Sequence, residues 1–371
     1  MVPIQRCAAM LTGLLAILGA GCGGGGGGGT MPAAGASVFT ATGTVASGAG
    51  QAAHMDADLL NPWGIAYGPA TRFWLADQGS GLSTVYDGAG NPLAPPVVVA
   101  IPKGAGSAGG GPTGVVFNGT TGFQGDTFIF ATLDGTLSGW SAGANATLRV
   151  DHFGAGAAYT GLARAAAGAV DYLYAANFAA GVIEVFDTGY APVNLGVGTL
   201  TDSALPAGYA PFNVQNLGGR LYVTYASRTP PSILANTGAG LGYVDVFNPD
   251  GTLAARFAGG APLNAPWGLA MAPSTFTPFA GALLVGNFGD GRITAFNAAT
   301  GAVLGQLSGS GGTPLAISGL WAIAPGNDAN AGSSGQLYYT AGPQGGTQGL
   351  FGSISANQPA SGGTGGTGTG Y

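Results

Sequence analysis

One unit of roughly 50 residues recurs along this chain, and the recurrence limits the fold more than any other feature of the sequence. The two clearest copies begin with Asn61-Pro62-Trp63-Gly64 and Ala265-Pro266-Trp267-Gly268. In each copy two short runs of β-branched and aromatic residues follow, separated by a turn such as Asn287-Phe288-Gly289-Asp290-Gly291. A chain that carries several such copies has duplicated a supersecondary unit, so we expect a repeat architecture.

Six copies can be recognised, and they begin at Asn61, Gly111, Tyr159, Tyr209, Leu263 and Ser318. Each copy shows three clear strands and a weaker fourth strand after an Asp-Gly or Asn-x-x-x-Gly turn. The period matches four-stranded propeller blades and is longer than the repeats of leucine-rich or hexapeptide solenoids. The sequence therefore predicts an all-β protein, a six-bladed β-propeller of four-stranded antiparallel blades over residues 37–355.

The ring needs a closing strand, because the sixth copy lacks a convincing fourth strand of its own. The alternating run from Val38 to Val45 belongs to no copy and could supply that strand, which would pair the two ends of the chain. Closure would leave only short, protected sheet edges. No segment shows a sustained helical period. The run from Ala163 to Val170 is the only tempting one, and because it is short and contains Gly168 we expect a loop there.

Charge and composition exclude some functions. Charged residues make up only 6% of the chain and the formal net charge is -6, so the clustered cations that bind nucleic acid are missing. The 74 glycines are compatible with a folded protein that has many tight turns, since the apolar residues fall in short strand-like runs. Both cysteines lie near the N-terminus, so we expect a propeller without disulfides.

The first 22 residues predict an export signal, with Arg6 before a short apolar core that ends at Gly21-Cys22. This segment resembles a bacterial lipoprotein signal, although Leu18 stands four places before Cys22 rather than the usual three. The resemblance implies lipidation of Cys22 and a membrane-anchored lipoprotein of the bacterial envelope. Secretion or a periplasmic location is the alternative. Residues 23–36 would be a glycine-rich tether and residues 356–371 a disordered tail rich in Gly, Thr and Ser.

The second and third strands of the copies, such as Leu284 to Phe296 and Gly242 to Phe247, resemble the NHL repeat of propeller blades. With the repeated Pro-Trp-Gly starts, they make the chain similar to an uncharacterised bacterial family of NHL-like β-propellers. Members of that family often end in a PEP-CTERM sorting tail. In this chain we expect the predicted lipid anchor to take the place of such a tail. The resemblance implies the propeller fold and brings no established activity.

In a four-stranded blade, the entry to the first strand and the turn between the second and third strands lie on the same face. We therefore expect the repeated starts and turns of all copies to surround one mouth of the central channel, where amides, carboxylates and indoles could bind a ligand. The candidate ligand-binding residues are Asn61, Trp63, Asp77, Asp134, Asn177, Asn213, Asn264, Trp267, Asn287 and Trp321. The alternative is structural: Asn and Asp suit such turns, and tryptophans can fill the wedges between blades.

An insertion from Ser227 to Gly240 replaces the corresponding turn of the fourth copy, and we expect it to overhang the same face, either as a functional lid or as a disordered loop. Signs of catalysis are few. His54 and His152 show no metal-ligand spacing and are interpreted as surface or turn residues, and Glu184, the only glutamate, is expected away from the axis. No catalytic residue is predicted.

These patterns favour an envelope-anchored binding or scaffolding propeller that uses its loop-rich face for a protein or glycan partner. We expect a monomer without a cofactor that contacts a membrane only through its lipid anchor. The alternative is a metal-dependent, lactonase-like hydrolase in which Asp77, Asn177 and Asn287 hold a calcium-type ion, although the axial glutamate of such sites is missing. A purely structural surface protein is the third hypothesis.

Overall fold

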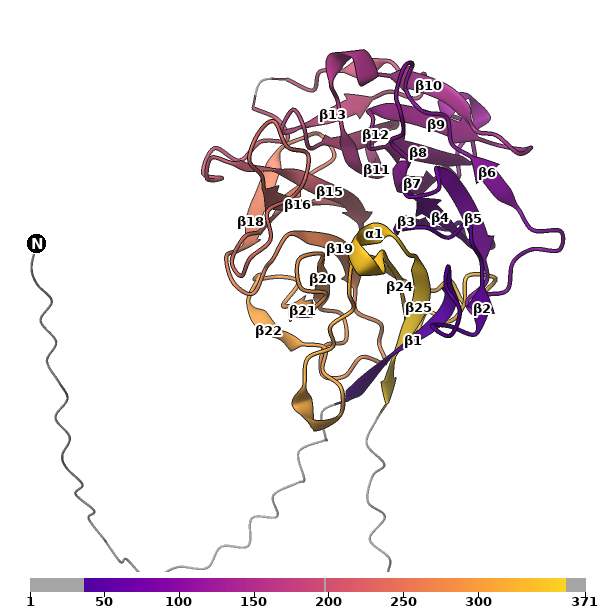
Figure 1. The fold of residues 1–371 in the computed structure, drawn as a ribbon. Coiled ribbons are helices and arrows are strands. Elements are labelled where there is room, and N and C mark those ends of the chain that lie inside the picture. Colours follow the sequence, from indigo (N-terminus) through magenta and orange to yellow (C-terminus); the bar gives the residue numbers. More distant parts are fainter. Residues whose placement is uncertain (1–36, 197, 358–371) are drawn as a thin grey trace, which may run out of the picture. The chain divides into compact units, whose positions relative to one another are not determined.

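The computed structural model describes residues 37–196 and 198–357, and these form six antiparallel sheets around an axis (Figure 1). Blade 1 contains β3 (Pro62–Ala66), β4 (Phe73–Asp77), β5 (Leu82–Tyr86) and β6 (Val98–Ala100). Blade 2 contains β7 (Pro112–Phe117), β8 (Phe128–Thr132), β9 (Thr136–Trp140) and β10 (Thr147–Asp151). Blade 3 contains β11 (Tyr159–Ala167), β12 (Val170–Asn177), β13 (Val182–Phe186) and β14 (Pro192–Val193). Blade 4 contains β15 (Tyr209–Leu217), β16 (Arg220–Ser227), β17 (Tyr243–Phe247) and β18 (Leu253–Gly259). Blade 5 contains β19 (Pro266–Met271), β20 (Leu283–Asn287), β21 (Ile293–Phe296) and β22 (Val303–Gln306).

The sixth blade joins the two ends of the propeller. It contains β23 (Leu320–Pro325), β24 (Leu337–Ala341) and β25 (Leu350–Asn357), and β1 (Val38–Ala46) forms its outer strand. β1 runs antiparallel to β25, with Val38 opposite Asn357 and Ala46 opposite Leu350. Figure 1 shows these indigo and yellow strands side by side, and the short β2 (His54–Met55) extends the sheet beyond β1. The predicted six-bladed propeller and its closing strand are confirmed.

The hydrophobic core is divided among the wedges between neighbouring blades. One wedge lies between blades 5 and 6, where Phe39 of β1 packs on Phe276 with ring centroids 5.1 Å apart. The wedge between blades 1 and 2 holds Trp74 and Trp140. Blade-to-blade packing, rather than any single central core, therefore stabilises the described part of the chain.

Glycine allows the inner strands of adjacent blades to approach each other. A Cβ added at Gly64 would lie 2.8 Å from the carbonyl oxygen of Thr113, and one at Gly114 would lie 2.6 Å from the backbone nitrogen of Leu162. Both glycines occupy the same place in their blades, at the β-bulge that interrupts pairing between the first and second strands. The glycine of the repeated start is thus explained by close contact between backbones.

The prediction of a loop between Ala163 and Val170 is wrong. β11 and β12 continue through this segment and form a hairpin at Gly168, whose φ is 63°. Ala163 and Ala165 alternate with the more exposed Arg164 and are buried in the wedge between blades 3 and 4. Alanine has little strand propensity of its own, so tertiary packing decided the conformation. In residues 37–196 and 198–357, helices are confined to short turns: η1 (Phe123–Gly125), η2 (Phe153–Ala155), η3 (Ser310–Gly312) and α1 (Pro343–Gly346).

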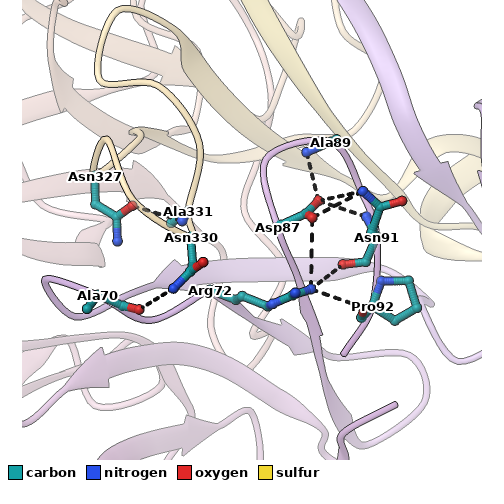
Figure 2. A network of polar contacts seen from close by, with 9 residues as sticks. All are labelled: Ala70, Arg72, Asp87, Ala89, Asn91, Pro92, Asn327, Asn330 and Ala331. Atoms are coloured by element: carbon teal, nitrogen blue, oxygen red, sulfur yellow. Dashed lines mark hydrogen bonds and ion pairs between the residues drawn. The ribbon is translucent and has the colours of Figure 1, made fainter. Parts of the chain in front are cut away.

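Side-chain amides fasten blade 6 to blade 1 where the ring closes. Asn327 donates from Nδ2 to the carbonyl oxygens of Gly68 and Thr71, both at 3.0 Å. Figure 2 shows the neighbouring Asn330, whose Nδ2 donates to the carbonyl oxygen of Ala70 at 2.8 Å. These bonds join loops that are more than 250 residues apart in sequence, so they add to the closure made by β1.

A second part of the same network orders the outer turn of blade 1. The Arg72 guanidinium donates from Nη1 to the carbonyl oxygens of Asn91 and Pro92, at 2.9 and 3.0 Å (Figure 2). Asp87 accepts the backbone N–H groups of Ala89 and Asn91, each at 2.9 Å. Asp87 therefore orders a turn by accepting hydrogen bonds from the backbone that follows it.

Several predictions concern residues outside those that the structure describes. These are the export signal at residues 1–22, the lipidation of Cys22, the tether at 23–36 and residues 358–371 of the tail that was predicted for 356–371, of which Ala356 and Asn357 are instead part of β25. They stay predictions. Within the described ranges, no helix is long and apolar enough to cross a membrane.

A buried carboxyl in blade 4 gives the fold a measurable pH dependence. Burial, together with the neighbouring Asp202, raises the pKa of Asp245 to about 7, whereas the pKa of an aspartate in an unfolded chain is about 3.9. Between these values the folded chain retains a proton that the unfolded chain has released. The contribution of Asp245 to the free energy of unfolding should therefore fall as pH rises from about 4 to about 7 and level off above that.

We expect Asp245→Asn to remove much of this slope and to raise the free energy of unfolding at pH 8 by about 2 kcal/mol. Urea unfolding of both proteins at several pH values would measure it. Asp250→Asn is the matched control, because Asp250 lies in an exposed turn where hydrogen bonds from Thr252 lower its pKa. Identical pH profiles for wild type and Asp245→Asn would contradict the prediction.

Candidate functional site

Three tryptophans from the repeated starts meet at the axis. Trp63 of β3 stacks on Trp321 of β23 with ring centroids 3.6 Å apart, and Trp267 of β19 meets both rings edge-on at 6.3 and 5.9 Å. Phe288 stacks on the other face of Trp321 at 4.2 Å. The three indoles are between 3% and 7% exposed, so they form an aromatic plug rather than an open mouth. Edge-on and stacked ring pairs of this kind stabilise each other beyond their burial.

Hydrogen bonds hold the plug in place. Trp321 Nε1 donates to Asn61 Oδ1 at 3.0 Å, and Trp267 Nε1 donates to the carbonyl oxygen of Thr160 at 2.9 Å. Asn213 Nδ2 donates to the carbonyl oxygen of Trp267 at 2.8 Å. These hydrogen bonds join Asn61, Asn213, Trp267 and Trp321, which come from blades 1, 4, 5 and 6. Trp63 Nε1, by contrast, is buried without a hydrogen-bond partner among the described residues.

The insertion covers this side of the plug. Ala235 packs against the aromatic cluster, and the Arg228 guanidinium lies over the Phe178 ring at 5.7 Å. Its backbone is ordered by Asn236, whose N–H donates to the carbonyl oxygen of Ser227, and by Gly238, whose N–H donates to Asn264 Oδ1. The predicted overhang is present, and it caps the face where the sequence placed the ligand mouth.

The remaining candidate residues accept hydrogen bonds from backbone N–H groups, some of them in loops up to 30 residues away in sequence. Asp134 Oδ2 accepts the N–H of Gly104 at 2.9 Å, and Asn264 Oδ1 accepts that of Gly238 at 2.7 Å. Asp77 is fully buried and accepts the N–H of Thr84. Burial raises the pKa of Asp77 well above its ordinary value. Ligand binding by these residues stays a prediction, while their observed contacts are those of turn residues.

Asp77, Asn177 and Asn287 belong to blades 1, 3 and 5. Asn177 Oδ1 accepts two backbone N–H groups, and Asn287 Oδ1 accepts the N–H of Asn264. Those oxygens are the atoms that a hard cation would need. Among the described residues, no group of three or more His, Cys, Asp or Glu side chains could hold a metal ion. The contacts of these three residues do not fit a calcium site, and no catalytic step follows from one.

Below the plug the axis opens into a well of about 470 Å³. Its lining runs from the middle of the inner strands, at Gly64, Asn213 and Trp267, to their ends, at Tyr67 and Phe117. Because the inner strands begin at the plug, the well opens on the face opposite to the one that the sequence favoured. Its size is within the range of small-molecule sites.

Backbone groups and neutral side chains supply the chemistry of the well. Each inner strand is the edge of its sheet, so one row of its N–H and C=O groups has no strand partner and faces the axis. Gln215 adds an amide, whereas Asn216 Nδ2 donates to the carbonyl oxygen of Arg164 and its Oδ1 accepts the N–H of Gly219. Burial raises the pKa of Tyr67 to about 12, which keeps its hydroxyl a neutral donor. Arg164 is the only charged residue among the described residues of the lining, and Asp171 pairs with it at 2.9 Å.

Sequence reasoning missed the residues at the mouth of this well. Tyr67, Phe117 and Gln215 stand at or near the ends of first strands, whereas the repeated motif marks only the beginnings of those strands. Their position one strand length beyond the start of each copy was an available signal. That position did not indicate which end of the channel is open.

No family model matches the chain. The chain is 36% identical over 329 residues to uncharacterized protein R648 of Acanthamoeba polyphaga mimivirus, and the match covers 83% of this chain and 78% of R648. Uncharacterized protein L690 of the same virus is 31% identical over 326 residues, with 83% of each protein covered. The assignment to an uncharacterised bacterial NHL-like family is therefore corrected: the relatives found are proteins of a giant virus.

Solved structures agree on the fold alone. A protein of unknown function from Bacteroides thetaiotaomicron superposes with a TM-score of 0.53 at 13% identity, covering 86% of this chain and 76% of that one. A glucose dehydrogenase superposes with a TM-score of 0.50 at 14% identity, covering 86% of this chain and 100% of that one. At such identities no activity can be transferred.

Proposed function

We propose a function for this chain, which belongs to the protein family of R648 and L690 of Acanthamoeba polyphaga mimivirus: it is a binding module whose axial well takes a glycan. The observation that carries the proposal is the blind well, closed at one end by the aromatic plug and open at the ends of the inner strands. A closed floor suits a ligand that is held rather than passed through.

The lining favours a neutral, polyhydroxylated ligand. Free strand edges and amides provide both donors and acceptors, which sugar hydroxyl groups can satisfy in pairs. Tyr67 and Phe117 offer aromatic rings for the apolar faces of a sugar. Because Arg164 is already paired with Asp171, an anionic ligand would gain little from it.

The lining also favours binding over hydrolysis. No imidazole, thiol or carboxylate lines the well among the described residues, so no general acid or base would touch a ligand there. The hydrolase hypothesis rests on a metal site that the contacts of Asp77, Asn177 and Asn287 do not favour.

We expect Gln215→Trp to block the well and to weaken glycan binding at least about tenfold, a loss of about 1.4 kcal/mol. A glycan array followed by calorimetry on the best ligand would measure it, with Leu253→Trp as the control because it adds the same side chain on the outer strand β18. Equal affinity for the two variants would contradict the assignment of the well. Failure of every glycan to bind wild type would contradict the proposed function itself.

A further inference from the structure

A polar cluster on blade 3 lies outside the well. His152 Nδ1 is 2.8 Å from Tyr159 Oη and 3.0 Å from Glu184 Oε2. Tyr159 donates its hydroxyl proton to the same Glu184 oxygen at 2.6 Å, and Asn177 Nδ2 donates to Glu184 Oε1 at 2.6 Å. The only glutamate and one of the two histidines of the chain are thus joined, although they stand 32 residues apart.

These bonds determine which imidazole nitrogen is free. An ionised carboxylate can only accept hydrogen bonds, and the Tyr159 proton is committed to Glu184, so the tyrosine oxygen accepts as well. His152 Nδ1 must therefore carry the proton in the neutral ring. Nε2 is left as an acceptor.

The cluster is held in advance of any ligand. Asn177 Oδ1 accepts the N–H groups of Ala158 and Ala180, which turns its NH₂ group toward Glu184. Burial and the Glu184 carboxylate raise the pKa of Tyr159, so the phenol stays a donor. Such support from a second layer of contacts is what keeps a binding group in one orientation.

His152 and Glu184 line a groove of about 550 Å³ on the outside of blade 3. The groove exists because β14 has only two residues and pairs only with Val185 and Phe186, so the rest of β13 is not covered by it. Much of the lining is aliphatic and includes Val182, Pro192 and Leu195. Val182 is 46% exposed, so one wall is open to solvent.

The groove therefore combines one negative charge with an apolar wall. Among the described residues that line it, Glu184 is the only Asp, Glu, Lys or Arg. Oε2 already accepts two hydrogen bonds and Oε1 accepts one, so one acceptor position remains on Oε1. From this geometry we infer that the groove is a second ligand site and binds an alkylammonium group, its charge at Glu184 and its unbranched stem along Val182 and Leu195.

Calorimetry with pentan-1-ammonium and pentan-1-ol as probes would test this inference. The two have similar apolar stems, and we expect the amine to bind at least about tenfold more tightly, because only the amine carries a charge complementary to Glu184. Glu184→Gln should abolish that preference, whereas Asp187→Asn, which removes a carboxylate from the outer turn of the same blade, should keep it. Equal binding of amine and alcohol, or no binding of the amine, would overturn the inference.

A second variant keeps the test informative if Glu184→Gln does not fold. Val182→Lys changes a solvent-exposed position and places a competing ammonium group at the groove, so amine affinity should fall by at least about tenfold. Unchanged affinity in that variant would argue against the site.

A lysine side chain and a free diamine both carry an alkylammonium group. Comparing the binding of N-acetyl-lysine-N-methylamide with that of 1,5-diaminopentane shows which of the two sources binds more tightly. Gln215→Trp should leave amine binding unchanged, which separates this site from the axial well.

Discussion

A chain that begins at Ser47, and so lacks β1, should lose the cooperative unfolding of the propeller. β1 supplies the outer strand of blade 6 and buries Phe39, Val45 and Ala46, which are at most 3% exposed. Removing one buried phenylalanine alone costs about 3 to 5 kcal/mol, against a total stability of about 5 to 15 kcal/mol for a typical domain. Loss of the strand also exposes the pairing edge of β25 and opens the ring.

Calorimetry and urea unfolding monitored by tryptophan fluorescence would check this expectation. A chain that begins at Ser37 retains all of β1 and should unfold in one transition like the full chain. Phe39→Ala in the full chain isolates the side-chain part and should lower the free energy of unfolding by about 3 to 5 kcal/mol. If the chain from Ser47 melted at the same temperature as the control, closure by β1 would not be what stabilises the ring.

Gly114→Val should destabilise the propeller by about 3 kcal/mol or more. The added Cβ would lie 2.6 Å from the backbone nitrogen of Leu162 in the next blade, and backbone cannot move aside as a flexible side chain can. The inner strands of blades 2 and 3 would have to separate, which disturbs the packing at the axis.

Gly154→Val is the matched control. Gly154 has no neighbouring heavy atom within 4 Å of an added Cβ, so we expect a change within about 0.5 kcal/mol. Urea unfolding of both variants at one pH measures the difference. Equal stability of the two variants would mean that the blades tolerate a wider axis than the contacts at Gly114 imply.

Local patterns determine much of this fold. The starts of the copies, their turns and their alternating strands are each visible in short windows, so blade number and strand order could be predicted from the chain alone. Closure by β1 could be predicted as well, because one unassigned strand near the start matched one missing strand near the end. The segment from Ala163 to Val170 was the exception, since its alanines gain strand structure only from the wedge that they fill.

The sequence by itself determined that this chain is a closed ring of six blades, because repetition and strand periodicity are local properties. Only the tertiary structure decided which end of the axis is open. Trp321 and Asn61 are 260 residues apart, and their contact beside the stacked indoles closes the end that the repeated motifs had marked. The pairing of His152 with Glu184 was equally hidden, because side chains from a loop and from a third strand meet only after the blades have packed.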